Sequence, residues 1–343
     1  MLAIDTIAVG AELPTQNKGP WTSSRIARWC AAQENWDRIH YDLDYARNVA
    51  KLPHTVINGA LKQHLLVQFL DQAFAGAGWI WRLDYRFVGM DLVGQSLAVG
   101  GVVRRIEKTG ERTFVHVDLN IRNLDAARVT TSGTAVVLFT TGGTPPLDAL
   151  DLLREGEALT HPEAVADANI PEAVRRSVGS EIDSVTAYSP VGLSRLRLFA
   201  EAVMNLRPLH YDAQAGAQSP YGTVVAPPLF PIHALSHAPG RRELSTDPEA
   251  FGREGASEVG RNIAQIFGLP AQGLLNGSNK AQIHSLLRVG ETVRARSVLA
   301  AARYREGARG GAMMIFETAN EYETTDGRPL LTEHQSIIQR QLA

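Results

Sequence analysis

Apolar residues along the chain follow two periods, one typical of helices and one typical of strands. From residue 59, the segment GALKQHLLVQFLDQAF has apolar positions every three or four residues. Its apolar stripe consists of Leu61, Leu65, Leu66, Phe69 and Leu70. Segments such as TFVHVDLNI and MMIFETANEYE instead alternate apolar and polar positions, as strands with one buried face do. Alternation predicts strands near 79–88, 96–107, 112–121 and 129–139, and again near 280–287, 291–303, 311–323 and 329–340.

The chain repeats one unit. RIARWCAAQENWDRIHYD, from Arg25, aligns with RLRLFAEAVMNLRPLHYD, from Arg195. The aligned polar pairs are Asn35/Asn205, His40/His210, Tyr41/Tyr211 and Asp42/Asp212. Further on, TVINGAL (55–61) aligns with TVVAPPL (223–229), and Gly94 aligns with Gly290. The offset grows from 168 to 196, so the second copy has about 28 extra residues before its long strands.

One apolar helix followed by about four long antiparallel strands predicts a sheet wrapped around a central helix, which is an α+β fold. Two such units in one chain are expected to pair their sheets edge to edge. We predict a first domain at 1–142, a linker at 143–178 and a second domain at 179–343. A chain of 343 residues is long enough to give each domain its own core.

Composition narrows the class of protein. The net charge of −2 argues against a nucleic-acid binder that neutralises many phosphates, and basic clusters such as Arg104-Arg105 are interpreted as solvated surface. No run of 18 apolar residues predicts a membrane span, and the N-terminus lacks the basic lead of a signal peptide. The single cysteine, Cys30, allows no internal disulfide and is predicted to pack in a helix. These features favour a cytoplasmic globular protein.

Several motifs in the same order resemble one known family. NWDRIHYDLDYA followed by TVINGAL resembles the loop and central-helix start of the MaoC-like (R)-specific enoyl-thioester hydratases and 3-hydroxyacyl-thioester dehydratases. GTVVAPPLFP and LLRVGETVRARS make the second copy resemble the N-terminal half of the long dehydratases in that group. The resemblance implies a double hot-dog fold. It also implies a lyase of fatty acid metabolism that adds water to a trans-2-enoyl thioester, or removes it from a (3R)-hydroxyacyl thioester, carried by coenzyme A or acyl carrier protein.

The family loop reads Asp, x, Asn, Pro, x, His. Carried over position by position, its histidine falls on His40, its Asp on Asn35 and its Asn on Asp37. An imidazole is suited to take a proton from water near pH 7, so we predict His40 as the base. Asn35, an amide in place of the family carboxylate, is predicted to orient the water through hydrogen bonds.

The start of the central helix is the predicted oxyanion site. Free amides at a helix N-terminus, aided by the helix dipole, stabilise negative charge on a thioester oxygen. We assign this role to the Gly59 amide, and predict that Asp37, Tyr41, Asn58 and Ala60 contact the substrate. No metal or redox cofactor is required for this chemistry.

The second copy is predicted to lack these donors. The alignment places Pro227 on Gly59 and Pro228 on Ala60, and proline has no backbone N–H. Catalysis is therefore assigned to the first copy, and His210 is given a structural role. Divergence of the copies favours one site per chain with a bulky or branched acyl group.

Simpler interpretations stand beside these. Asn35 could cap a helix, and Asp42 and Asp212 are interpreted as turn residues. His233 and His237 have the i, i+4 spacing of a metal pair, but no third ligand accompanies them, so chance is the better explanation.

Two other functions are kept open. A hot-dog thioesterase would need a carboxylate near the central helix, and INGALKQH offers none. A non-catalytic subunit that binds acyl thioesters would explain the missing loop Asp. Since the chain carries both copies, a monomer is expected to be a complete pseudo-dimer, with a homodimer possible but not required.

Overall fold

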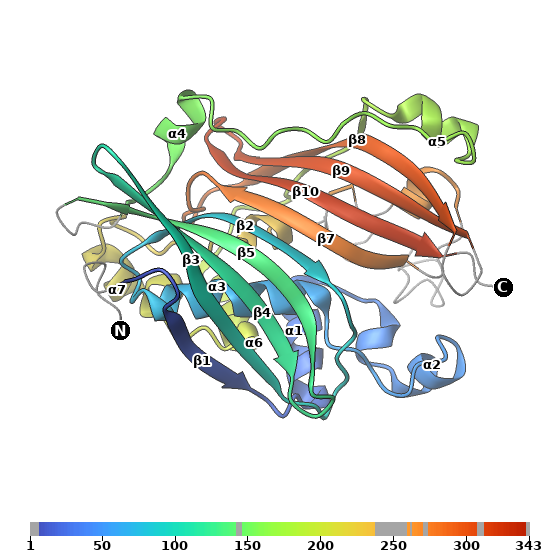
Figure 1. Ribbon diagram of the computed structural model, residues 1–343, viewed down its shortest axis with the longest axis horizontal. Coiled ribbons are helices and arrows are strands. Elements are labelled where there is room, and N and C mark those ends of the chain that lie inside the picture. The colour runs from blue at the N-terminus through green and yellow to red at the C-terminus, as the bar shows by residue number, and fades with distance from the viewer. Residues whose placement is uncertain are drawn as a thin grey trace.

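The computed structural model describes residues 7–141, 146–236, 259–260, 263–269, 274–306 and 312–340. Its centre is one antiparallel sheet with the strand order β1-β3-β4-β5-β2-β7-β10-β9-β8-β6 (Figure 1). The first half supplies β1 (Glu12–Lys18), β2 (Trp79–Phe87), β3 (Leu97–Thr109), β4 (Arg112–Asn123) and β5 (Arg128–Thr140). The second half supplies β6 (Glu181–Thr186), β7 (Leu274–Ile283), β8 (Val293–Glu306), β9 (Ala312–Thr324) and β10 (Pro329–Arg340).

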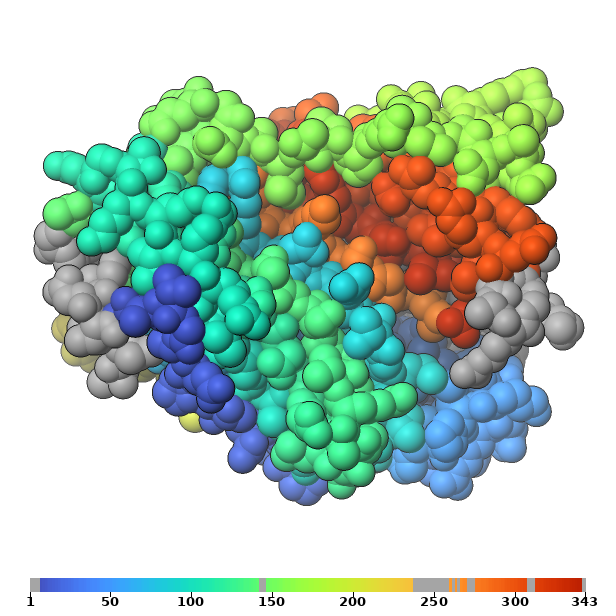
Figure 2. All heavy atoms as spheres, in the orientation of Figure 1, coloured from blue at the N-terminus to red at the C-terminus, as the bar shows by residue number. Residues whose placement is uncertain are grey.

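The two halves join through β2 and β7. These strands pair antiparallel from Arg82 opposite Gln282 to Arg86 opposite Ser278. The join makes one continuous surface of first-half and second-half strands (Figure 2). The predicted α+β fold, with two sheets joined edge to edge, is therefore confirmed.

The long alternating strands were predicted well, with two exceptions. The strand expected near 280–287 is β7, which ends at Ile283 because the amides of His284 and Ser285 turn to bond the Leu330 carbonyl. The outer strands β1 and β6 were not predicted. Both are short edge strands with mostly exposed or half-buried residues, so neither shows a clear alternation of buried and exposed positions.

The central helix α3 (Gly59–Ala73) lies against the concave face of the first sheet. All five stripe residues are completely buried, as the apolar period predicts. The helix is also buried on its polar side, because α1 (Ser23–Gln33) and α6 (Leu193–Val203) cover it. Trp29 of α1 packs on Phe199 of α6 with ring centroids 5.4 Å apart, which links the two halves behind the sheet.

The remaining helices are short. In chain order they are η2 (Arg38–His40), α2 (Leu43–Asn48), α4 (Leu150–Arg154), α5 (Glu172–Ser177), η3 (Pro208–His210), α7 (Ala213–Gln218), η4 (Phe230–His233) and α9 (Ile263–Ile266). Where the second copy was expected to have a long central helix, the described residues form only η4. Residues 237–258, which hold much of the predicted insertion, lie outside the described residues.

The segment between the halves is not a bare linker. It carries α4 and α5 and runs along the second half of the sheet, where Ala166 bridges Ala302 of β8 (Figure 1). Arg112 of β4 pairs with Asp151 and Glu155 near α4, so the segment also contacts the first half. The domain boundaries given above remain a prediction.

Candidate active site

The first Asn-to-His loop lies between α1 and α2. Glu34, with a φ of 56°, turns the chain at the end of α1 and occupies the cap position that Asn35 was considered for. The Asn35 side chain is buried, and its Oδ1 accepts a hydrogen bond from the Asp37 amide at 3.1 Å. The Asp37 carboxylate in turn accepts from the Ile39 amide at 3.3 Å. The loop is therefore shaped by its own polar side chains, with His40 at its end.

His40 is held beside the start of the central helix. The residue is 7% exposed, and its Nδ1 lies 2.8 Å from the carbonyl oxygen of Val56. A carbonyl only accepts, so Nδ1 carries the proton and Nε2 is the basic nitrogen. The Val56 amide donates back to the Ile39 carbonyl at 3.0 Å. These two bonds clamp the loop to the segment that leads into α3.

The second loop has the same geometry. Asn205 Oδ1 accepts from the Arg207 amide at 3.1 Å, and His210 Nδ1 lies 2.8 Å from the Val225 carbonyl. Burial lowers the pKa of His210 to about 4, so its ring is neutral at pH 7. The two loops alone therefore do not distinguish the halves.

The first turn of α3 presents unbonded amides. Asn58 is the N-cap residue and makes no side-chain capping bond. Among the described residues, no acceptor bonds the amides of Gly59 and Ala60. The ring of Phe87 lies 3.0 Å from the place where a Cβ on Gly59 would be, so a larger residue would press on that ring. Two donors at the positive end of the helix dipole can thus bind a developing anion.

A buried ion pair fixes the start of α3. Lys62 Nζ lies 2.8 Å from Asp91 Oδ2, and both side chains are at most 3% exposed. Asp91 also accepts from Asn123 and Thr130, each at 2.8 Å, while its carbonyl accepts from the Ile57 amide. Burial lowers the pKa of Lys62, and Asp91 opposes this. The network fixes the position of the helix start.

The structure corrects the alignment of the two helix starts by one residue. His40 bonds the Val56 carbonyl and His210 bonds the Val225 carbonyl, which gives an offset of 169. The next amides agree with this offset. Ile57 donates to the Asp91 carbonyl, and Ala226, which follows Val225, donates to the Leu287 carbonyl. The sequence alignment was displaced because both segments begin with Thr-Val.

The corrected register changes the expected donors. Gly59 corresponds to Pro228 rather than to Pro227, and Ala60 corresponds to Leu229. Leu229 has an amide N–H, so the second copy lacks one donor and not two. The prediction that both donors are missing is wrong, but the position of Gly59 is still occupied by a proline.

Tyr41, predicted to contact substrate, and the two aspartates interpreted as turn residues make hydrogen bonds within their own loops. The Tyr41 hydroxyl donates to the Trp36 carbonyl at 3.0 Å, within the loop. Asp42 accepts from the Tyr45 amide at 2.9 Å, and Asp212 accepts from the Ala215 amide at 2.8 Å. The interpretation of both aspartates as turn residues is confirmed.

Sequence reasoning missed a chain of buried polar side chains between the halves. The Tyr85 hydroxyl donates to Gln63 of α3, and Gln63 Nε2 lies 3.4 Å from His233 Nε2 of η4. His64 Nε2 lies 2.9 Å from the same atom, and burial lowers the pKa of His64 well below its usual value. His233 thus pairs with α3, and His237 lies outside the described residues. The sequence did hold a signal for this chain, because Gln63 and His64 stand inside a strongly apolar helix.

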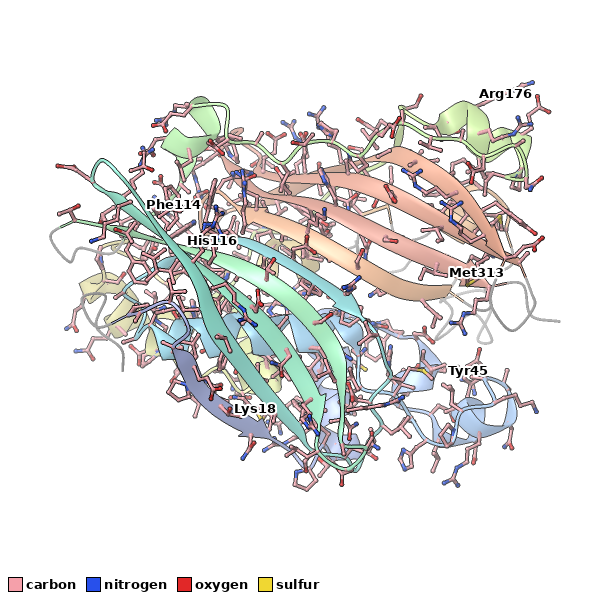
Figure 3. The ribbon with its side chains drawn as sticks, in the orientation of Figure 1. Lys18, Tyr45, Phe114, His116, Arg176 and Met313 are labelled. Carbon is pink, nitrogen blue, oxygen red and sulfur yellow. The ribbon has the colours of Figure 1, made fainter. Side chains whose placement is uncertain are left out.

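Other candidate chemistry is not supported. Within the part of the chain that the structure describes, no group of three or more His, Cys, Asp or Glu side chains could hold a metal. Arg104 pairs with Asp118, and Arg105 pairs with Glu107 and contacts the ring of His116. Figure 3 labels His116 on this part of the first sheet. This basic cluster is an exposed ladder of ion pairs, as predicted. No helix of the described residues is long and apolar enough to cross a membrane.

Both halves match models of dehydratase families. Residues 10–93 match the family described as hydroxyacyl-thioester dehydratase type 2, and residues 176–333 match FAS1-like, dehydratase domain region. The chain is also 26% identical over 163 residues to a UPF0336 protein of Saccharopolyspora erythraea, covering 48% of this chain and 88% of that one.

Solved structures share the whole architecture. A MaoC domain protein dehydratase of Chloroflexus aurantiacus has a TM-score of 0.65 at 13% identity, with 99% of this chain and 97% of that one covered. A Mycobacterium tuberculosis protein described as a double hotdog fold has a TM-score of 0.57 at 12% identity, with 98% of each chain covered. The molecule is therefore a double hot-dog protein. The resemblance to MaoC-like hydratases and hydroxyacyl-thioester dehydratases is confirmed, and it supports a hydratase or dehydratase role.

Proposed function

We propose that the protein is a hydro-lyase that interconverts a trans-2-enoyl thioester and a (3R)-hydroxyacyl thioester at one site in its first half. The observation that carries the proposal is the clamp between His40 and the Val56 carbonyl, beside the unbonded amide of Gly59. This arrangement supports a base and an oxyanion donor on adjoining segments. The family matches of both halves support the same reaction class.

The chemistry needs a water, a base and a place for negative charge. In hydration, His40 Nε2 takes a proton from water, which attacks the β-carbon, and Asn35 orients the water within the loop. The Gly59 amide donates to the thioester oxygen as enolate charge builds there. The protonated His40 then returns its proton to the α-carbon, which regenerates the base, and dehydration follows the same steps in reverse.

The finer features of the substrate belong to this proposal. We expect coenzyme A or acyl carrier protein as the thiol carrier and a bulky or branched acyl group. The strong divergence of the second half supports a bulky or branched acyl group. The fused halves support a complete site in each monomer, so a homodimer would not be needed for activity. A cytoplasmic location agrees with the single buried cysteine, Cys30.

A spectrophotometric assay tests the reaction. The purified chain is mixed with crotonyl-CoA and with bulkier enoyl-CoAs, while enoyl absorbance and free thiol are followed together. Loss of enoyl absorbance with the thioester intact supports the hydro-lyase. Release of thiol would instead support a hot-dog thioesterase. No change with any substrate would favour a non-catalytic acyl-thioester-binding subunit.

A further inference from the structure

One corner of the first sheet carries three exposed arginines without an acidic partner. Arg86 lies at the end of β2, Arg122 at the end of β4 and Arg128 at the start of β5. Arg86 Nε donates to the Ser132 hydroxyl at 3.4 Å, and Arg122 donates to the Ala127 carbonyl at 3.0 Å. Among the residues that the structure describes, no carboxylate forms an ion pair with any of the three arginines.

The carboxylates nearby do not offset this charge. Asp84 of β2 lies 3.7 Å from Lys280 of β7 and is thus paired with another cation. Asp125, in the turn between β4 and β5, accepts from the Ser96 amide at 2.6 Å. One aspartate beside three arginines leaves the corner positive, whereas the ladder that contains Arg104 is paired along its length.

Apolar side chains are exposed at the same corner. They are between 40% and 55% exposed and belong to the loop after β2 and to the ends of β4 and β5, namely Val88, Met90, Leu124 and Val129. The amides of Val88 and Gly89 donate to the Thr130 carbonyl, which holds the loop against β5. Val129 stands opposite Arg122 in the ladder of β4 and β5. An exposed apolar patch with a polar rim is typical of a surface that binds another protein.

The corner adjoins the proposed oxyanion site. The Gly89 carbonyl accepts from Lys62 Nζ at 3.2 Å, and Lys62 lies about one turn beyond Gly59 on α3. Further along the same loop, Leu92 bridges Val56, whose carbonyl is bonded by the loop histidine. The corner is therefore separated from the Gly59 amide by one helical turn and one lysine side chain.

We infer that this corner docks an acidic carrier protein, which delivers the acyl thioester to the Gly59 amide in preference to free coenzyme A. The inference deepens the proposed function and rests on the thioester binding at Gly59. The unpaired arginines favour a negatively charged partner, but the phosphates of coenzyme A would satisfy them as well. The exposed apolar residues separate the two carriers, because a protein surface buries them and a phosphate does not.

Binding of a saturated, non-reacting thioester tests the inference without turnover. Calorimetry compares a butyryl-loaded acyl carrier protein with butyryl-CoA, which share the acyl group and the pantetheine arm and differ in what is attached to it. The carrier protein should bind at least about five-fold more tightly, the scale of one important interface side chain. Its affinity should fall as salt is added, because the arginines are exposed. Equal or tighter binding of butyryl-CoA would overturn the inference.

A double variant, Val88→Ser with Val129→Ser, separates a protein from a coenzyme. It should lower the ratio of the carrier-protein affinity to the butyryl-CoA affinity at least about five-fold. Both side chains are exposed, so folding should be kept, as circular dichroism can confirm. Leu198→Ser with Leu206→Ser, which changes two exposed leucines of the second half, is the matched control and should leave the ratio unchanged. An unchanged ratio in the corner variant would contradict the inference.

A second double variant, Arg86→Glu with Arg122→Glu, tests the charge of the corner. It should weaken binding of the carrier protein at least about ten-fold, because like charges then meet across the interface. Arg154→Glu with Arg175→Glu alters the net charge equally at exposed positions of α4 and α5 and should weaken binding about two-fold or less. Equal losses in the two variants would mean that only net charge matters, and no docking corner would remain.

The remaining outcomes are distinct. If the Val88 and Val129 variant changes the sedimentation of the protein but not its binding of the carrier, the corner is a contact between copies of this chain and the inference is wrong. If the chain binds phosphatidylglycerol vesicles while it does not prefer the carrier protein, a lipid surface is the partner and the inference is again wrong. If the corner variants remove a clear preference for the carrier protein but no enoyl thioester is hydrated, the hydro-lyase proposal fails while the docking inference stands.

Discussion

The concave faces of the two halves have the same strand geometry and opposite chemistry. In the first half, Gly101, Leu119 and Gly133 lie side by side across β3, β4 and β5. The corresponding row across β8, β9 and β10 is Ser297, Asn320 and Glu333. Gly101 leaves room for the helix, because a Cβ there would lie 3.0 Å from Phe69 of α3. The first half is thus shaped to pack its own helix, and the second presents polar atoms instead.

The two Asn-to-His loops, unlike the concave faces, are alike in the two halves. The Asn and His side chains of both loops make the same hydrogen bonds, yet the helix starts that the loops contact differ at Gly59 and Pro228. A preserved loop therefore does not identify a working site. In our proposal the neighbouring amide of Gly59 does, and it assigns the chemistry to the first half.

Replacing each loop histidine in turn tests that separation most strongly. His40→Ala should lose at least about 10²-fold in kcat/KM, the usual scale of general-base catalysis. His210→Ala should keep most activity, because Pro228 offers no donor beside it. Enoyl-CoA kinetics on both variants, with circular dichroism to confirm folding, make the measurement. Equal losses would mean that both halves serve one site, and the reverse pattern would move catalysis to the second half.

The helix start is tested by exchanging the residues that differ. Gly59→Pro should lower kcat by about 10²–10³-fold, because the oxyanion donor is gone. Gly59→Ala is the control, since it keeps the amide while adding a Cβ against Phe87. Pro228→Ala should leave kcat unchanged. Similar losses for Gly59→Pro and Gly59→Ala would show that crowding at Phe87, and not the donor, matters.

The ion pair beneath α3 is another difference between the halves. Lys62→Met should lower the free energy of unfolding by about 3 kcal/mol, because Asp91 is left buried without its partner. Adding Asp91→Leu, which copies Leu287 of the second half, should recover most of the loss. Urea denaturation measures both. A double variant as unstable as the single one would contradict this account of the pair.

A smaller effect is expected from pH. The unfolded chain protonates histidine near pH 6.5, whereas burial lowers the pKa of His210 to about 4 in the folded protein. Between these values the unfolded state binds more protons, so stability falls as pH decreases, by up to about 1.4 kcal/mol per pH unit from this residue. His210→Asn should flatten the decline of Tm between pH 6.5 and 4. An unchanged slope of Tm against pH would mean that other groups, such as His284, cause the decline.

Much of this arrangement could be predicted from the sequence. The repeated Asn-to-His loops and the alternating strands were enough to define the fold and to place His40 beside a helix start. The edge strands β1 and β6 escaped notice because short strands with one or no fully buried residue carry little periodic signal. The sequence alignment at Gly59 was displaced by one residue because both segments begin with Thr-Val. The true register is set by the hydrogen bonds of the two loop histidines to the Val56 and Val225 carbonyls.

The buried polar residues of β9 and β10 were visible in the sequence but not interpretable there. Thr318 and Asn320, like Glu333 and Gln335, stand two positions apart on strands, which places each pair on one face. In an alternating strand, a polar face is normally assigned to solvent. Only the packed structure shows that this face is the buried one, because the outer side carries exposed ion pairs such as Arg296 with Glu321.

The segment between β5 and β6 joins both halves into one polypeptide and so changes what mutation can do to them. In a dimer of identical chains, every substitution appears in both partners at once, and neither can specialise without the other. Here Pro228 and Glu333 are inherited by one half alone. One polypeptide therefore lets each half change on its own, with the ratio of the two halves fixed at one to one in every molecule made.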